Sequence, residues 1–159
     1  MMQEVWEKIR SIRESRRDPK KLNLLLDEWE RDLGDEYNQI AEELIAEHTR
    51  SALSKFASEK GLSSLDDLIN FLWEQWTEGE CTIERTKTTV QIYCTKCPIA
   101  DVYQSINKEK YGLLFHCSED PYIVEGYNPK IKFKRTKTLM NGDDCCNHFY
   151  SLEENIHDF

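Results

Sequence analysis

The sequence predicts an α+β protein in which N-terminal helices pack on an antiparallel sheet built from two hairpins, with short helices between the hairpins. Two observations support this fold class. Apolar residues recur at helical spacing from Met2 to Gly79. After Gly79 the pattern changes to the alternation of apolar and polar residues that is typical of strands.

Helices are expected throughout the stretch before Gly79, and capping and terminating residues mark their limits. Asp18 and Pro19 suit the N-cap and first turn of a helix, and glycines suit the helix ends. The expected helices run from Met2 to about Arg17, from Asp18 to Gly34, from Asp35 to Gly61, and from a capping box at Ser63 or Ser64 to Gly79. We interpret residues 1–34 as a helical extension, residues 35–152 as the α+β domain and residues 153–159 as a C-terminal tail.

The second half of the chain predicts two hairpins and two short helices. The first hairpin joins alternating segments around Ile83 and Ile92. One helix begins at Pro98 and reaches about Ile106. A second helix covers Leu113 to about Gly126, before Asn128-Pro129 breaks it. A strand from Ile131 to about Leu139, a tight turn and a last strand from about Cys146 to Leu152 complete the second hairpin.

Charge and hydropathy exclude several classes of function. The net charge of −9 argues against unaided binding to nucleic acid or to an anionic membrane, because both need a basic face. No apolar run approaches the ~18 residues of a membrane span, and the charged N-terminus has no signal-peptide core. We therefore expect a cytoplasmic protein. In a reducing compartment its six cysteines would be free thiols, metal ligands or catalytic groups, or simply small buried hydrophobes.

Thiols with metal-ligand spacing occur in the second half of the chain. Cys94 and Cys97 form a Cys-x-x-Cys pair, as in zinc and iron–sulfur sites. Candidates for the remaining ligands are Cys117, Cys146, His148 and, behind them, His116. Cys145 and Cys146 are adjacent, so on a strand their side chains point to opposite faces and only one can easily join the site. Thiolates of Cys97, Cys117 and Cys146 would leave a fourth position for water or substrate. The expected cofactor is a zinc or iron ion, an iron–sulfur cluster, or none.

Four motifs follow one another in this region. They are Cys97-Pro98-Ile99-Ala100, Phe115-His116-Cys117 with Asp120, the run from Phe133 to Leu139, and Gly142-Asp143-Asp144 with Cys146. The ordered set resembles the amino-thiazoline carboxylate hydrolase family over roughly Leu53 to Leu152. The resemblance implies ring-opening hydrolysis of a cyclic amidine to an N-carbamoyl cysteine, and it favours Cys146 over Cys145.

The resemblance also implies a wider relationship and one departure. The family is distantly similar to vinyl-reductase-type domains, which are α+β, dimeric, and bind small molecules or metal near a cysteine cluster. Asn147 stands where the family commonly has an acid. If that acid is the catalytic base, the activity of this chain would be changed or lost.

Roles for individual residues follow from the amidine chemistry. Cys97 is the first candidate for a nucleophile, because the predicted helix starting at Pro98 would lower its pKa; His116 or His148 could act as the base. Asp120, Asp143 and Asp144 could orient water or bind an amidinium, although turn chemistry also explains the last two. Arg135 could bind a substrate carboxylate.

These patterns lead to two hypotheses. The first is a small hydrolase that acts on a cyclic C–N substrate in a pocket lined by Cys97, Cys117 and Cys146. The second is a non-catalytic sensor domain that binds a small ligand or metal and dimerises through its helices. The expected partners are a small molecule and a second copy of the chain, with no nucleic acid and no membrane.

Overall fold

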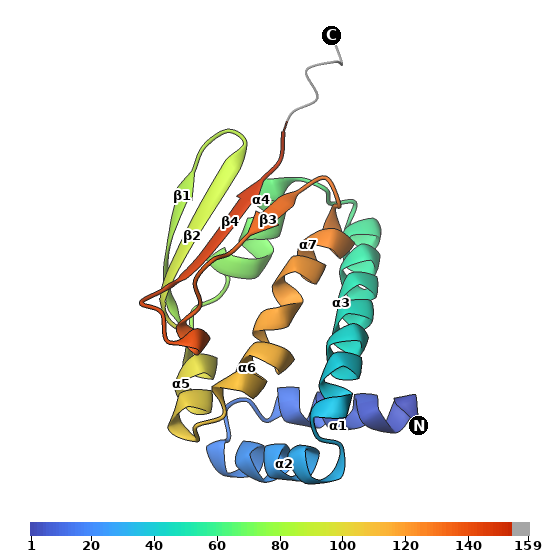
Figure 1. Cartoon of the computed structure of the whole chain (residues 1–159). Coiled ribbons are helices and arrows are strands. Elements are labelled where there is room, and N and C mark those ends of the chain that lie inside the picture. Colours follow the sequence, from blue (N-terminus) through green and yellow to red (C-terminus); the bar gives the residue numbers. More distant parts are fainter. Residues whose placement is uncertain (154–159) are drawn as a thin grey trace.

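The computed structural model describes residues 1–153 (Figure 1). Its helices are α1 (Met2–Glu14), α2 (Pro19–Asp32), α3 (Asn38–Lys60), α4 (Leu65–Ile69), α5 (Pro98–Ser105), α6 (Glu109–Phe115) and α7 (Asp120–Tyr127). Its strands are β1 (Glu80–Arg85), β2 (Thr89–Lys96), β3 (Lys132–Lys134) and β4 (Cys146–Ser151). Short helical segments are η1 (Asp35–Tyr37), the π-helical η2 (Asn70–Glu74), η3 (Cys117–Glu119) and η4 (Leu139–Asn141).

The four strands form one antiparallel sheet in the order β1-β2-β4-β3. The predicted α+β class is therefore confirmed. In the register of the sheet, Cys94 on β2 lies opposite Cys81 on β1 and opposite Cys146 on β4. Side chains alternate between the two faces of a strand, so Cys146, His148 and Tyr150 share the face of β4 that is turned toward the helices.

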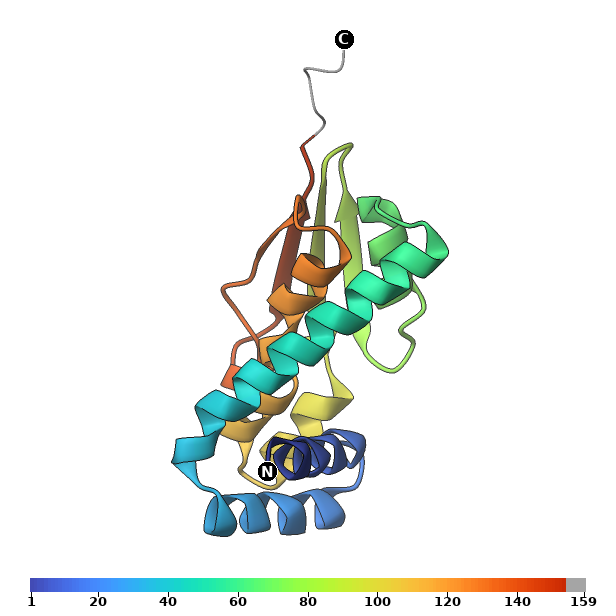
Figure 2. The ribbon, with the colours of Figure 1, turned by 90° about the vertical axis from the view of Figure 1, so that its right-hand side faces the viewer.

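The helices form two packed groups, and only one of them packs against the sheet. At one end of the molecule, α1 and α2 cross below α3 and α6 and bury a core with α5 that includes Ile9, Leu26, Trp29 and Phe115 (Figures 1 and 2). At the other end, α3, α4 and α7 pack against the sheet around Leu68, Ile92 and Tyr150. Because α3 runs the length of the molecule, it contributes to both cores (Figure 2).

Local sequence signals account for several element limits. Asp18 accepts a hydrogen bond from Lys21 N at 3.1 Å and caps α2, and Ser64 accepts one from Asp67 N at 3.1 Å and caps α4, as predicted. The left-handed Gly61 (φ 64°) ends α3. Gly126 on α7 lies so near Arg50 on α3 that a β-carbon would stand 2.4 Å from the Arg50 carbonyl oxygen. This close crossing fixes the position of α7 against α3. It therefore also fixes the position of Asp120, the first residue of α7.

Several predicted elements are shorter than expected. The helix expected over 113–126 is instead α6, η3 and α7, because the chain turns at His116 (φ −127°, ψ −57°) between two helices. The strand expected to reach Leu139 ends at Lys134. The fourth helix changes to a π-helix at Asn70 and ends well before Gly79. Apart from Glu153, the predicted tail lies outside the described residues.

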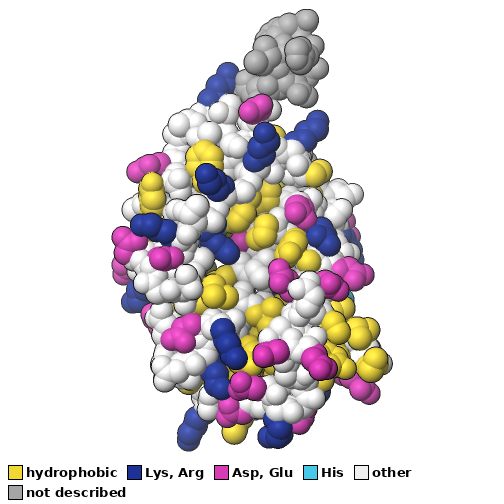
Figure 3. Space-filling model, in the orientation of Figure 1, with side chains coloured by type: hydrophobic (Ala, Val, Ile, Leu, Met, Phe, Trp, Pro, Cys, Tyr) yellow, Lys and Arg dark blue, Asp and Glu magenta, His cyan; other side chains and the backbone are white. Residues whose placement is uncertain are grey.

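No helix within residues 1–153 has both the length and the apolar character that spanning a membrane requires. Hydrophobic side chains do gather at the surface along the seam between the sheet and the helices α6 and α7 (Figure 3). A cavity extends inward between these elements.

Candidate functional site

A cavity of ≈ 400 Å³ lies between the sheet, the start of α5 and the η3–α7 segment. Its polar lining comes mainly from residues that the motifs singled out: Cys94, Cys97, His116, Cys117, Asp120, Arg135, Cys146 and His148. Its apolar lining includes Leu72, Trp73, Trp76, Ile99, Met140 and Tyr150. The sequence motifs, which are spread over more than fifty positions, therefore meet at one place in the fold. We call this place the inner cavity.

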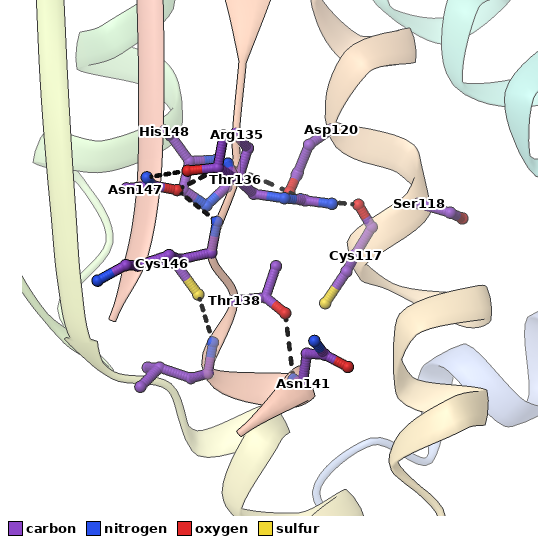
Figure 4. Close-up of polar contacts among 12 residues, drawn as sticks. Cys117, Ser118, Asp120, Arg135, Thr136, Thr138, Asn141, Cys146, Asn147 and His148 are labelled. Carbon is purple, nitrogen blue, oxygen red and sulfur yellow. Dashed lines mark hydrogen bonds and ion pairs between the residues drawn. The ribbon is translucent and has the colours of Figure 1, made fainter. Parts of the chain in front are cut away.

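The predicted thiols Cys97, Cys117 and Cys146 all line the inner cavity, together with Cys94. Cys145 does not line it, as expected from the alternation along a strand. Cys146 Sγ accepts a hydrogen bond from Leu139 N at 3.2 Å (Figure 4). All six cysteines are free.

The thiols are held in their neutral form. Burial raises the pKa of Cys94 and of Cys117 to about 12, and it also raises the pKa of Cys97 and Cys146. The predicted lowering of the Cys97 pKa is therefore wrong. Backbone N–H groups of Ile99 and Ala100 at the start of α5 do act in that direction, but the desolvation of the thiol outweighs them.

Asp120 is one of two carboxyl groups that line the cavity, and Arg135 and His148 lie next to it (Figure 4). Arg135 Nη1 donates to Asp120 Oδ2 and also to the Cys117 carbonyl oxygen, at 3.0 Å for the latter. His148 Nδ1 lies 3.8 Å from Asp120 Oδ2. Burial raises the pKa of Asp120 to about 7, although the Arg135 guanidinium acts in the opposite direction. Asp120 therefore exchanges a proton near neutral pH.

Both histidines of the cavity are neutral. Burial lowers the pKa of His116 and of His148 to about 3, and nearby arginines add to the effect. His116 Nε2 lies 2.9 Å from the Tyr103 hydroxyl, so this ring already has a partner. His148 Nδ1 is buried and has no hydrogen-bond partner among the described residues. A ligand in the inner cavity could satisfy it.

Other predicted residues lie outside the cavity and hold the β3–β4 connection. Asp143 accepts a hydrogen bond from Thr138 N at 2.9 Å, and Asp144 pairs with Lys137 at 3.1 Å. Asn147 Oδ1 accepts from Thr136 N and Lys137 N, and its Nδ2 donates to Thr136 Oγ1 at 2.7 Å (Figure 4). These contacts shape the turn and keep Arg135 and Thr138 at the cavity wall.

Metal binding stays a prediction. Within the part of the chain that the structure describes, no group of three or more His, Cys, Asp and Glu side chains is arranged to hold a metal ion. The present arrangement of thiols therefore does not fit the three-ligand site, and no step below uses a metal. Metal analysis of purified protein, with the Cys97→Ser/Cys117→Ser double variant as control, tests this prediction.

Sequence reasoning missed Arg13 and Arg16, which also line the inner cavity. Arg13 Nη2 lies 2.6 Å from Glu119 Oε2, and Arg13 also donates to the Phe115 carbonyl oxygen. These contacts join residues more than one hundred positions apart. No local pattern in α1 distinguishes these arginines from the other basic residues of an amphipathic helix.

The fold and the cavity define a small α+β domain with a cavity lined by carboxyl groups, imidazoles and several thiols. Residues 19–150 match the sequence model of the L-2-amino-thiazoline-4-carboxylic acid hydrolase family, so the chain belongs to this family. The predicted resemblance is thereby confirmed. The match begins earlier than the expected Leu53 and includes α2 and α3, whereas α1 lies outside it.

Other comparisons add little. No curated protein matches this chain. Among solved structures, the chain is similar to a trafficking protein particle complex subunit 3 from Naegleria fowleri, which is covalently bound to palmitic acid. The identity is 16%, the TM-score is 0.48, and the alignment covers 91% of this chain and 98% of that one. A likeness this weak carries no functional argument.

Proposed function

We propose that the protein hydrolyses a cyclic amidine and opens its ring, with Asp120 as the general acid–base. The observation that carries this proposal is a carboxyl group with a pKa raised to about 7, at the wall of a cavity that fits a small molecule. A general acid–base works best when its pKa lies near the working pH. The family name supports the same reaction type.

Two neighbours support the role of Asp120. Arg135 is a positioning residue, because its guanidinium bridges the Asp120 carboxyl group and the Cys117 carbonyl oxygen. It also limits the rise of the Asp120 pKa. His148 stays neutral. Its Nδ1, which has no partner among the described residues, lies close enough to Asp120 to contact a water or substrate held between them.

In the proposed reaction, water attacks the amidine carbon of an amino-thiazoline ring. Asp120 accepts one proton from this water and passes it to the ring nitrogen, so the tetrahedral intermediate carries a hydroxyl group and a ring N–H. Asp120 then accepts the remaining proton of the hydroxyl group, the oxygen becomes a carbonyl oxygen, the carbon–sulfur bond breaks, and Asp120 gives this proton to the leaving sulfur. One water is consumed and one ring bond is broken, so an N-carbamoyl thiol is formed and Asp120 returns to its starting state.

The thiols favour attack by water over attack by cysteine. A nucleophilic cysteine reacts as its thiolate, and burial raises the pKa of each thiol in the inner cavity. We therefore assign Cys97, Cys117 and Cys146 to the shape and polarity of the wall. Neutral thiols and the apolar side chains around them suit the sulfur and methylene groups of the ring.

A second function is a binding domain without catalysis. The apolar lining and the neutral thiols favour it, since both suit retention of a ligand as well as turnover. Such a domain would bind the amino-thiazoline carboxylate without opening its ring. Homodimer formation and cytoplasmic location stay predictions under either function.

The experiment is to incubate the full chain with 2-amino-thiazoline-4-carboxylate and to follow thiol release. We expect turnover by the native protein and a loss of kcat/KM of about 100-fold or more in Asp120→Asn. Asp32→Asn is the matched control, because Asp32 is an exposed residue of α2 outside both the cavity and its supports. Binding without thiol release would favour the binding domain. Equal activity of Asp120→Asn and the native protein would remove Asp120 from the mechanism.

A further inference from the structure

A second cavity of ≈ 460 Å³ lies beside the inner cavity, and α1 forms much of its wall. Arg13, Arg16, Glu119 and Ile123 line both cavities, so the two share this boundary. The remaining lining comes from α1 and α3. We call this second cavity the outer groove.

The α1 wall of the outer groove lies outside the family match. The match covers residues 19–150, whereas Arg13 and Arg16 precede it. These two arginines nevertheless reach the inner cavity as well as the groove. The N-terminal segment therefore adds binding surface to a cavity whose other walls belong to the matched region.

Among the residues that the structure describes, Arg16 is the one arginine of the groove that pairs with no carboxylate. Arg10 pairs with Glu14 at 3.6 Å, and Arg13 pairs with Glu119 at 2.6 Å. Arg16 donates only to the Arg13 carbonyl oxygen at 3.4 Å, and no carboxylate within residues 1–153 lies at ion-pair distance from it. In a protein of net charge −9, a half-buried guanidinium of this kind is a favourable place for an anionic group.

The groove also offers a flat apolar wall. Trp6 on α1 stacks on His48 on α3, with ring centroids 3.7 Å apart and an angle of 2° between the ring planes. Leu53 and Ile123 complete the apolar lining on the α3 and α7 side. Such a surface suits a planar or apolar group next to an anion that Arg16 binds.

We propose that the inner cavity and the outer groove form one two-chamber site for an organic anion larger than amino-thiazoline carboxylate. Arg16 binds the negative group at the shared wall. An apolar or planar extension of the ligand lies against Trp6 in the groove, and the reactive end lies near Asp120. The placement of the reactive end rests on the proposed hydrolysis, whereas the binding of the anion at Arg16 does not.

The test uses two probes that cannot be hydrolysed at a ring amidine. Calorimetric titration of the full chain compares 1-naphthoate with its neutral analogue 1-naphthamide. We expect the anion to bind about tenfold more tightly, because a hydrogen bond to a charged group gains about this much. Arg16→Gln should remove the preference, and Arg16→Lys should retain part of it. Arg31→Gln is the matched control, since Arg31 is an exposed arginine of α2 that pairs with Asp32.

The groove itself is tested by Trp6→Ala, which should weaken both probes about fivefold, while Trp6→Phe should keep most of the affinity. Thermal unfolding of each variant checks that it is folded. The proposal is overturned if the two probes bind equally or not at all, if Arg16→Gln and Arg31→Gln behave alike, or if Trp6→Ala binds as the native protein does. All of these outcomes are independent of hydrolysis, so failure of the proposed reaction would be seen separately.

Discussion

Two regions of the molecule each carry an aspartate and a cysteine, and they differ in nearly every property of these side chains. Cys117 is the first residue of η3 and Asp120 the first residue of α7, whereas Asp144 and Cys145 lie in the turn before β4. The Asp120 side chain is 24% exposed and lines the inner cavity, whereas that of Asp144 is 81% exposed and pairs with Lys137. Burial raises the pKa of Asp120 to about 7, but Lys137 lowers the pKa of Asp144. Solvent access, not residue type, separates the two regions.

The largest expected difference concerns the two thiols. With a pKa of about 12, Cys117 is thiolate at pH 8 only to about one part in 10⁴. The pKa of Cys145 is also raised, but its thiol lies in the turn at the surface. We expect iodoacetamide to alkylate Cys145 about 100-fold faster than Cys117, as measured by mass spectrometry over time. Equal rates in denaturant are the control, and equal rates in the folded protein would contradict the comparison.

A smaller difference is expected in how the free energy of unfolding depends on pH. The slope contributed by the aspartate has opposite signs in the two regions. Asp120 has a raised pKa, so the folded state holds its proton between about pH 4 and 7, where the unfolded state has lost it. The contribution of Asp120 to the free energy of unfolding therefore falls with rising pH, by on the order of 1 kcal/mol per pH unit. Asp144 has a lowered pKa, so its contribution is present above its ordinary pKa and is lost as the pH falls below it.

Denaturant unfolding of Asp120→Asn and Asp144→Asn between about pH 2.5 and 8 measures these slopes, because the change for Asp144 falls below its ordinary pKa. Relative to the native protein, Asp120→Asn should gain stability as the pH rises. Asp144→Asn should show a deficit that disappears toward acid pH. Differences from the native protein cancel the effect of the two buried histidines. Parallel curves for the native protein and Asp120→Asn would mean that Asp120 ionises in the folded protein as it does in the unfolded chain.

The same contrast explains what the sequence could predict. The helical stripes, the caps at Asp18 and Ser64 and the β1–β2 hairpin are local patterns, and the structure confirms them. The family motifs also brought Cys97, Asp120 and Arg135 to one list of candidates. The environment of each group was not predictable, because it depends on packing. The burial that raises the Cys97 pKa comes from distant elements, whereas the helix start that lowers it is visible in the sequence.

Long-range contacts also limited the prediction of the site. Arg13 reaches the cavity because α1 packs beside η3, which is encoded far along the chain. The β3 strand ends at Lys134 because the following residues are held mainly by side chains, with one backbone hydrogen bond from Asn147 N on β4 to the Lys137 carbonyl oxygen. Thr136 and Lys137 donate their backbone N–H groups to Asn147, and Thr138 donates its own to Asp143. No periodic pattern of apolar residues in the sequence predicts such a segment.

The smallest expected effect concerns Asn147, a position at which the family resemblance implies an acid. On β4, Asn147 alternates with Cys146 and His148, and it does not line the inner cavity. Its amide instead binds Thr136 and Lys137. Asn147→Asp keeps both acceptor contacts of Oδ1 and loses the donation to Thr136 Oγ1. We therefore expect kcat/KM for the amino-thiazoline carboxylate to change by less than about twofold and stability to fall by about 1 kcal/mol or less. A large gain in turnover would instead show that an acid at this position acts as the base, and it would move the catalytic group from the cavity to the turn.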